Sequence, residues 1–193
     1  MKTDRNAWID RHAEQGRAYV GHRQLDNADT QIDIIKAATE VFLFQEVENT
    51  LDFGCGWGRF STYLNEHSKL VTGIDWIPSA LKDMESDNPT IKVIPYEELP
   101  LPTADEEFDR VWTCMVMQHI VDHERFLSTC KELNRVAKIG AQFVMIENHR
   151  DEAPHVALRN VAAYTNALGI TLTHSELLSI DKKQSHWLII GQK

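Results

Sequence analysis

The sequence predicts an α/β fold: a doubly wound, mostly parallel sheet that ends in an antiparallel hairpin of two strands. Short apolar runs alternate with amphipathic segments along most of the 193 residues, as in the strand-helix units of parallel sheets. The last two apolar runs, residues 170–180 and 186–190, follow each other without a helical pattern between them. Such neighbours pair antiparallel, so one edge of the sheet should be a hairpin.

The chain is expected to form one domain behind an N-terminal arm. Its length and its 42% content of hydrophobic residues suffice for one substantial core. Residues 5–18 predict a short helix, and the polar stretch 19–30 shows no sustained period. We therefore predict a helix and a lid-like arm over residues 1–30, and the folded domain over residues 31–193.

The first strand-helix unit surrounds a turn that is rich in glycine. Apolar residues between 31 and 44 recur at spacings of three and four, which predicts an amphipathic helix before the unit. Residues 50–53 then predict a strand, residues 54–58 form the turn, and residues 59–67 predict the next helix.

The second strand is predicted over residues 70–74, and Pro78 suits the first turn of a helix that runs to about Glu85. Residues 91–94 predict the third strand, and residues 108–114 predict the fourth.

A capped helix should follow the fourth strand. Asp122 can cap a helix that runs to about Ala137, and Gly140 is expected to end it. Residues 142–146 predict the fifth strand. Residues 155–168 predict the last helix, which the glycine directly after it should stop.

Composition and charge argue against several classes of function. No run of about 18 apolar residues occurs, and the charged N-terminus is unlike a secretory leader. Three widely spaced cysteines, Cys55, Cys114 and Cys130, suit neither a disulfide framework nor a zinc motif. A formal charge of −9 opposes attraction to phosphate backbones. We expect a soluble, cytoplasmic protein whose partner is neither a membrane nor a nucleic acid.

Three glycines stand at alternate positions after the first core strand. Gly54, Gly56 and Gly58 let the backbone bend sharply and approach a ligand, and the following helix offers unpaired N–H groups. In open parallel sheets, ligands bind at this end of the strands. The G-x-G-x-G spacing departs from the dinucleotide fingerprint at Arg59, which disfavours a nicotinamide cofactor. An anion or carboxylate suits the loop, and a purely structural turn is the alternative.

Asp75 closes the second strand, where a carboxylate can accept hydrogen bonds from two ribose hydroxyls. A turn aspartate is the alternative interpretation. At this point the sequence resembles the class I S-adenosylmethionine-dependent methyltransferases, through LDFGCGWGR at residues 51–59 and GIDWIP at residues 73–78.

Two further segments match the same family. They are ELPLP at residues 98–102, which leads to FDRVW at residues 108–112, and VMQHI at residues 116–120. The resemblance covers about residues 50–193. It implies a Rossmann-like fold, S-adenosyl-L-methionine as the cofactor and methyl transfer as the reaction.

The resemblance also implies roles for residues around the glycine turn. Asp52 and the turn, including Cys55, would hold the methionine part of the cofactor. Asp75 would hold the ribose, and Trp76 would pack on the adenine. Met115 would line the cofactor near the end of the fourth strand.

One departure from the family concerns the adenine. Relatives with this type of Leu-Pro segment carry an acidic residue where this chain has Pro95. Tyr96 or Glu97 is expected to take its place, and each is equally readable as a solvated loop residue.

Methyl transfer from a sulfonium is an in-line displacement, so a base is useful only for a hydroxyl or a protonated amine. His119 follows the fourth strand and is the first candidate for that base, although it could equally pack or orient the substrate. Glu147 ends the fifth strand and, with Asn148 and His149, could contact the acceptor or only be solvated. Tyr19 of the arm is the third candidate.

Several functions stay open from the sequence. His119 and His123 have a spacing that could present two imidazoles to a metal, but no third ligand is evident, so we expect no metal. The leading function is methyl transfer to an oxygen or nitrogen of a small acceptor, such as a sugar or another metabolite. Methylation of a macromolecule and cofactor binding without catalysis are the alternatives.

Overall fold

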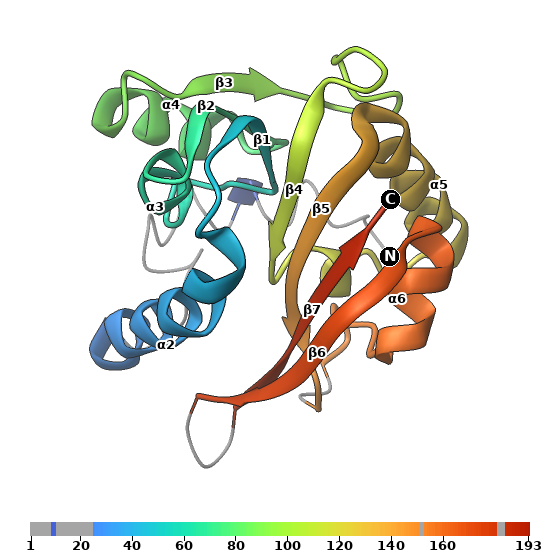
Figure 1. Cartoon of the computed structure of the whole chain (residues 1–193). Helices are drawn as coiled ribbons and strands as arrows, with labels where there is room; N and C mark the ends of the chain where they lie inside the picture. Colours follow the sequence, from blue (N-terminus) through green and yellow to red (C-terminus); the bar gives the residue numbers. More distant parts are fainter. Residues whose placement is uncertain (1–8, 11–24, 151–152, 181–183) are drawn as a thin grey trace.

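A seven-stranded sheet forms the centre of the computed structural model, which describes residues 9–10, 25–150, 153–180 and 184–193 (Figure 1). The strand order is β3-β2-β1-β4-β5-β7-β6. The pairs from β3 to β5 are parallel, and β7 pairs antiparallel with both β5 and β6. The strands are β1 (Val47–Phe53), β2 (Ser68–Asp75), β3 (Lys92–Pro95), β4 (Phe108–Cys114), β5 (Ala137–Asn148), β6 (Thr171–Ser179) and β7 (Ser185–Gln192).

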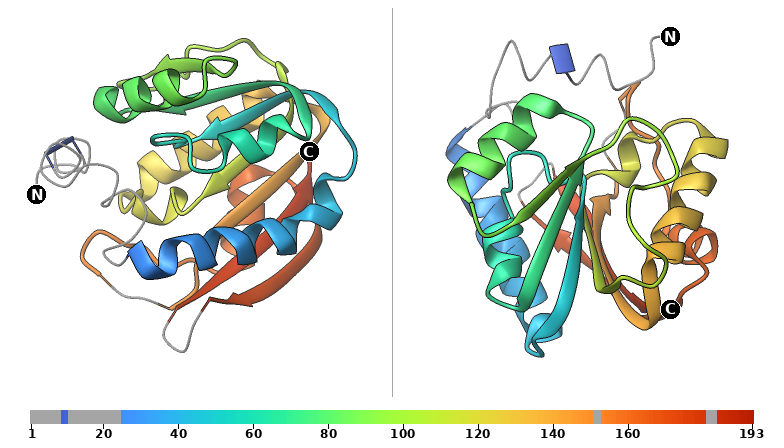
Figure 2. Two further views of the ribbon diagram at one scale, coloured as in Figure 1. Left: turned by 90° about the vertical axis from the view of Figure 1, so that its left-hand side faces the viewer. Right: turned by 90° about the horizontal axis from the view of Figure 1, so that it is seen from above.

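Helices cover both faces of this sheet (Figure 2). One buried cluster joins α5 and α6 to the sheet, and a second cluster joins α2, α3 and α4 to the opposite face. The predicted doubly wound sheet with an antiparallel hairpin is therefore confirmed. The helices are α2 (Leu25–Leu43), α3 (Ser61–Asn65), α4 (Pro78–Asp87), α5 (His123–Val136) and α6 (Val161–Leu168), with a 3-10 turn, η2 (Met117–His119).

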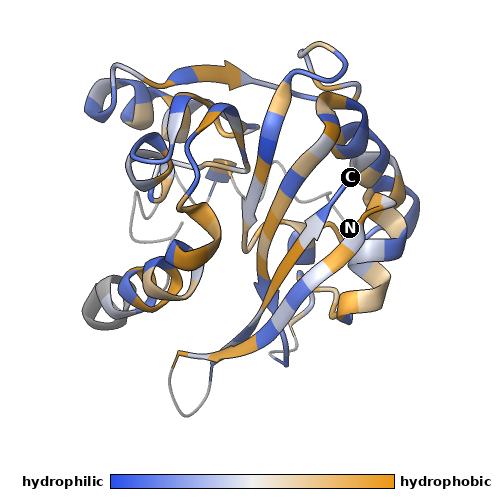
Figure 3. Ribbon diagram, viewed as in Figure 1, coloured by the Kyte–Doolittle hydropathy of each residue, from blue (hydrophilic) through white to orange (hydrophobic). Residues whose placement is uncertain are grey.

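Three residues begin or end helices where the sequence predicted that they would. Pro78 lies at the start of α4, and the Asp122 carboxylate accepts a hydrogen bond from the Arg125 N–H at 2.7 Å. Gly169 ends α6 with a φ of 66°, a left-handed conformation that glycine adopts without strain. Hydrophobic and hydrophilic residues are interspersed along α5 (Figure 3), and its hydrophobic residues Phe126, Cys130, Leu133 and Val136 are buried in the core.

Several predicted boundaries were wrong, and three of them are instructive. Helix α2 begins at Leu25 rather than residue 31, because a helix can extend beyond the part whose apolar face reveals it. Gly140 does not follow the end of α5 as a stop signal but lies inside β5, with a φ of 83°. The pairing with β4 shifts there, because Phe108 pairs with Ala137 whereas Arg110 pairs with Gln142. The unpaired residues between these two positions form a bulge, and the left-handed glycine accommodates it.

The third correction concerns the segment before α6. The helix begins at Val161 rather than residue 155, and the Asn160 side chain caps it by accepting from the Ala163 N–H at 2.8 Å. The residues before it instead hold a turn near the strand ends, where the Ala157 N–H donates to the Gln118 carbonyl at 2.8 Å. Tertiary hydrogen bonds thus replace the first helical turns.

Apart from residues 9–10, which are helical, the predicted N-terminal helix at residues 5–18 lies outside the described residues, as does the predicted arm up to residue 24. Within the described ranges, no helix combines the length and apolarity that a membrane crossing requires.

Candidate functional site

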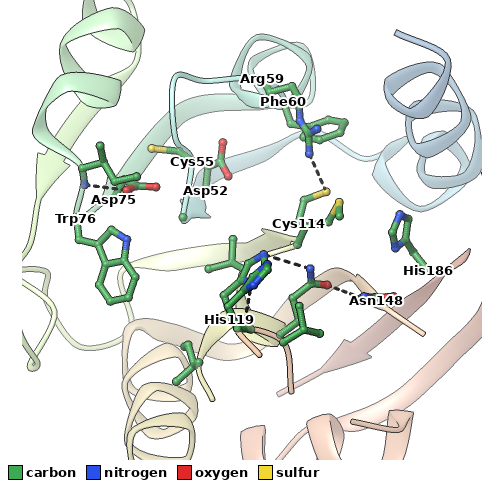
Figure 4. A pocket seen from close by; sticks show the side chains of 18 of the residues that line it. Asp52, Cys55, Arg59, Phe60, Asp75, Trp76, Cys114, His119, Asn148 and His186 are labelled. Atoms are coloured by element: carbon green, nitrogen blue, oxygen red, sulfur yellow. Dashed lines mark hydrogen bonds between the residues drawn. The ribbon is translucent and has the colours of Figure 1, made fainter. Parts of the chain in front are cut away.

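A cavity of about 440 Å³ opens at the carboxyl ends of β1, β2, β4 and β5 (Figure 4). This is the edge of a parallel sheet at which ligands bind, because the loops after the strands diverge there. Its volume lies within the usual range for small-molecule sites. The glycine turn, the end of β2 and the segment after β4 form its walls.

The glycine turn needs its glycines. Gly54, Gly56 and Gly58 have φ angles of 73°, 56° and 89°, which side chains make costly. At Gly54 a Cβ atom would lie 2.4 Å from a Val116 methyl carbon, so the backbone there touches the segment after β4. The Gly54 N–H donates to the Ile74 carbonyl at 2.7 Å, which ties the turn to β2.

Asp75 lines the cavity and organises the turn. Its carboxylate accepts hydrogen bonds from the Gly56 N–H and the Ile77 N–H, both at 2.9 Å. Each carboxylate oxygen has a second lone pair, which can accept from a ligand hydroxyl. The carboxylate is therefore rigidly placed before any ligand arrives.

Asp52 is the second buried carboxylate on this side. Its side chain accepts from the Ser61 hydroxyl at 2.6 Å and is only 4% exposed. Burial raises the pKa of Asp52 to about 7, with the nearby Asp75 adding to the rise, while the Ser61 hydrogen bond and the Arg59 charge oppose it. A positively charged group next to Asp52 would restore its ionised form.

Two aromatic rings form a platform beside Asp75. The Trp76 and Tyr96 rings stack with centroids 6.2 Å apart and planes at 13°. The guanidinium of Arg125, a residue of α5, lies 4.7 Å from the Trp76 ring centroid. Both aromatic residues line the cavity, whereas Glu97 is exposed and does not. The expectation that Glu97 meets the adenine is therefore not met in this structure.

Met115 and Cys55 complete this part of the cavity wall. Met115 has a φ of 60°, which is rare for a residue with a side chain and is held by its N–H donating to the Ile146 carbonyl at 2.7 Å. Burial raises the pKa of Cys55, so its thiol stays neutral.

His119 lines the cavity with its ring held at both nitrogens. Its Nδ1 lies 3.0 Å from the His155 carbonyl, which can only accept, so Nδ1 carries the proton. The Gln118 side-chain oxygen accepts from the Asn148 N–H at 2.6 Å, which turns the Gln118 amide nitrogen toward His119 Nε2 at 3.2 Å. The Nε2 lone pair therefore receives a hydrogen bond from Gln118.

Glu147 does not face the ligand side, which corrects the expectation that it contacts an acceptor. The side chain is fully buried and lies behind the segment after β4. Its carboxylate accepts from the N–H groups of Met117 at 3.1 Å and Gln118 at 3.0 Å, and from the Thr113 hydroxyl at 3.2 Å. Burial raises the pKa of Glu147 to about 7 against these donors. Glu147 holds the segment that carries His119.

The other acceptor candidates fall into separate places. Asn148 lines the cavity, whereas His149 contacts Ser185 and does not line it. Tyr19 lies outside the described residues. His119 ends η2 and His123 begins α5, so they do not share one helical face. Among the described residues, no three or more His, Cys, Asp or Glu side chains gather as metal ligands.

Sequence reasoning missed a polar wall of the cavity to which Arg59, Asn148 and His186 contribute, with the Gln31 side chain linking Arg59 to His186 outside the lining. The Arg59 Nη1 donates to the Gln31 side-chain oxygen at 3.3 Å, and the Gln31 amide nitrogen lies 3.0 Å from His186 Nε2. Arg59 could have been suspected from its place directly after the glycine turn. Gln31 and His186 are 155 positions apart, and no local pattern joins them.

These residues fit S-adenosylmethionine. The turn brings bare backbone to the cavity, Asp52 provides negative charge for the ammonium group of the amino acid part, and Asp75 provides acceptors for ribose hydroxyls. The stacked pair of Trp76 and Tyr96 suits a flat purine base.

Comparisons with known proteins agree with this geometry. A family model described as a methyltransferase domain matches residues 51–145. A demethylmenaquinone methyltransferase from Staphylococcus saprophyticus is 31% identical over 110 residues, which are 54% of this chain and 46% of that protein. A malonyl-[acyl-carrier protein] O-methyltransferase from Pseudescherichia vulneris is 27% identical over 124 residues, 64% of this chain and 46% of that protein. The chain thus spans about half the length of these relatives.

Solved structures share the whole fold. The N-methyltransferase NodS from Bradyrhizobium japonicum, in complex with S-adenosyl-L-homocysteine, superposes with a TM-score of 0.75 at 16% identity, over 98% of each chain. A methyltransferase dependent on S-adenosylmethionine from Aquifex aeolicus gives a TM-score of 0.69 at 21% identity, over 99% of each chain. With the methyltransferase domain matched at residues 51–145, this chain belongs to the class I S-adenosylmethionine-dependent methyltransferases.

Proposed function

We propose that this protein transfers the methyl group of S-adenosylmethionine to an oxygen or nitrogen of a small acceptor. One observation carries the proposal: a single cavity combines the glycine turn, two buried carboxylates and an aromatic pair with a separate polar wall. The turn, the carboxylates and the aromatic pair suit the cofactor, and the space beside the polar wall suits an acceptor. The relatives named above methylate different acceptors, so the acceptor has to be inferred from this chain.

The cofactor supplies a methyl group on a sulfonium when it is bound. Asp52 and the glycine turn would hold its amino acid part, with Cys55 on the wall. Asp75 would accept from the ribose hydroxyls, and Trp76 with Tyr96 would enclose the base. The ordered hydrogen bonds of Asp75 reduce the conformational entropy that binding would otherwise cost.

The chain's own residues accelerate transfer by placing the acceptor in line behind the methyl carbon. Such positioning can be equivalent to a concentration on the order of 10⁵ to 10⁸ M, so no nucleophile on the protein is needed. Met115 lines the same cavity, and the hydrogen bond from its N–H to the Ile146 carbonyl holds its left-handed backbone in place. The segment before α2 is proposed as a lid that excludes water, and α2 with the residues after it as the catalytic domain.

Calorimetry with the full chain tests the proposal. S-adenosylmethionine and S-adenosylhomocysteine should each bind with micromolar dissociation constants, and a nicotinamide dinucleotide should not bind. A folded sample that binds neither methionine-derived ligand at millimolar concentration would contradict the proposal. Release of S-adenosylhomocysteine during incubation with acceptors then separates an enzyme from a protein that only binds the cofactor.

A further inference from the structure

We propose that Arg159 is a positioning residue for methyl transfer, which fixes the wall of the cavity that carries His119 (Figure 4). This inference rests on the proposed function, because it assigns one more residue to the same site. Arg159 is not among the residues that line the cavity in the described part of the chain, so it would act through residues that do. The evidence is the set of bonds by which its guanidinium joins two segments of this wall.

Two segments of the chain meet in this wall. The first, residues 116–120, follows β4 and contributes Gln118, His119 and Ile120 to the lining. The second, residues 153–160, precedes α6 and contributes His155 and Val156. Apart from η2, neither segment has regular secondary structure, so bonds between the two have to fix their relative position.

Arg159 joins the two segments at two points. Its Nη1 donates to the Met117 carbonyl at 3.1 Å, and its Nη2 donates to the Ile120 carbonyl at 2.7 Å. Met117 begins η2 and Ile120 directly follows it, so the two prongs of the guanidinium span the turn. A planar guanidinium holds two acceptors in fixed positions, whereas the ammonium of a lysine is a single point of attachment.

The guanidinium of Arg159 is itself held in place. It lies 3.8 Å from the centre of the Phe126 ring on α5, a distance at which a guanidinium and an aromatic ring attract each other. The next residue, Asn160, caps α6 by accepting from the Ala163 N–H, so the backbone that carries Arg159 leads directly into a helix. Arg159 is therefore anchored to both helices that pack on this face of the sheet.

Glu147 holds the first segment by its other backbone groups. The carboxylate accepts from the N–H groups of Val116 at 3.3 Å, Met117 at 3.1 Å and Gln118 at 3.0 Å. An anion thus binds the donors of this segment, and a cation binds its acceptors. Loss of Arg159 would leave the bonds to Glu147 in place, so the first segment would keep its tie to β5 and lose its tie to the second segment.

The contact between the two segments reaches His119 directly. The His119 Nδ1 donates to the His155 carbonyl at 3.0 Å, and the Ala157 N–H donates to the Gln118 carbonyl at 2.8 Å. Arg159 adds the charge-assisted bonds, which are the stronger kind. We therefore expect that loss of Arg159 releases the His119 ring, whereas the glycine turn, which Arg159 does not contact through these bonds, keeps its affinity for the cofactor.

NMR of the full chain saturated with S-adenosylhomocysteine tests the inference. With ¹⁵N-labelled histidine at about pH 8, where an ordinary histidine is neutral, the His119 ring should carry its proton on Nδ1, and His119→Ala assigns its signals. In Arg159→Gln the proton should be shared between both ring nitrogens. The Ala157 N–H should exchange with solvent at least about tenfold faster. Arg159→Lys, which keeps the charge but not both bonds, should reverse these changes only in part.

Arg135→Gln provides the matched control. Arg135 also donates to two loop carbonyls, those of Leu101 and Thr103, both at 3.1 Å, and neither of these residues lines the cavity. Both substitutions remove one charge and bonds of the same kind, so thermal unfolding should show that both lower stability. Only Arg159→Gln should change the His119 signals. An acceptor that releases S-adenosylhomocysteine in the assay above adds a second readout: its turnover should fall by at least about tenfold in Arg159→Gln and stay unchanged in Arg135→Gln.

Three results would overturn the inference alone. One is that Arg159→Gln leaves the His119 and Ala157 signals or the turnover unchanged, and the second is that Arg135→Gln alters them equally. The third is that Arg159→Gln weakens S-adenosylhomocysteine by more than about tenfold, because Arg159 would then act through the cofactor site. If Arg159→Gln does not fold, the same measurements on Arg159→Lys decide. Failure of the unaltered chain to bind S-adenosylhomocysteine contradicts the proposed function instead.

Discussion

The two halves of the cavity are built in different ways. The cofactor half comes mainly from residues 52–96, and its turn holds three glycines, Gly54, Gly56 and Gly58, in left-handed conformations. The polar wall instead brings together Arg59, Asn148 and His186 from distant parts of the chain, and the Gln31 side chain, which does not line the cavity, links Arg59 to His186. A site made of backbone tolerates few substitutions, whereas a site made of side chains can change its ligand while the fold persists.

The largest expected effect tests the backbone half. Gly54→Ala should abolish measurable binding of S-adenosylhomocysteine, a loss of more than about 100-fold, because a Cβ would strain a left-handed residue and collide with Val116. Gly140→Ala is the matched control: its φ is 83°, but the nearest atom to its Cβ lies 3.9 Å away. Gly140→Ala should lower stability by about 1 to 2 kcal/mol and leave cofactor affinity unchanged. Equal effects of the two substitutions on binding would show that close packing at Gly54 is irrelevant.

The second effect separates a side chain that supports this backbone from one that does not. Asp75→Ala should weaken S-adenosylhomocysteine by about 1 to 3 kcal/mol, because it leaves hydroxyls and two N–H groups without their acceptor. Glu97→Ala removes an exposed carboxylate that does not line the cavity and should have no such effect. Calorimetry of the two variants checks the prediction, and a strong effect of Glu97→Ala would restore Glu97 as an adenine contact.

The third effect is the pH dependence of cofactor binding, which reports the protonation of Asp52. The pKa of Asp52 is raised to about 7 in the protein without ligand, and the ammonium group of the cofactor's amino acid part would bind the ionised form. As the pH falls below 7, the protonated fraction grows and affinity should fall by up to about tenfold per pH unit. Asp52→Asn should flatten this dependence over pH 5 to 7, as titration calorimetry can measure. A wild-type affinity that stays constant over this range would contradict the raised pKa.

The smallest expected effect concerns His119. With an acceptor that has no proton to lose, His119→Ala should lower turnover by less than about tenfold. A hydroxyl acceptor that needs His119 as its base would instead lose roughly 10² to 10⁴ in turnover. His123→Ala, which alters an exposed histidine at the start of α5, is the control. Initial rates for both variants over a range of pH distinguish the two roles.

Glu147 and Asn148 illustrate the limits of prediction by strand position. Both were expected on the ligand side because they end the fifth strand, yet only Asn148 lines the cavity. Neighbouring residues of a strand point to opposite faces, and the end of a strand alone does not reveal which face is open. Glu147 points at the N–H groups after β4, a partner that exists only when the two strands are adjacent.

The sequence by itself determined the sheet, the positions of most helices, the glycine turn and the places of Asp52 and Asp75. These features depend on local rules: apolar periodicity, left-handed glycine and the position of an acid at the end of a strand. Only the tertiary structure decided the start of α6, the burial of Glu147, the proton position on His119 and the polar wall, in which Gln31 links Arg59 to His186. Each of these depends on hydrogen bonds between residues far apart in the chain, and no local period in the sequence encodes such a partner.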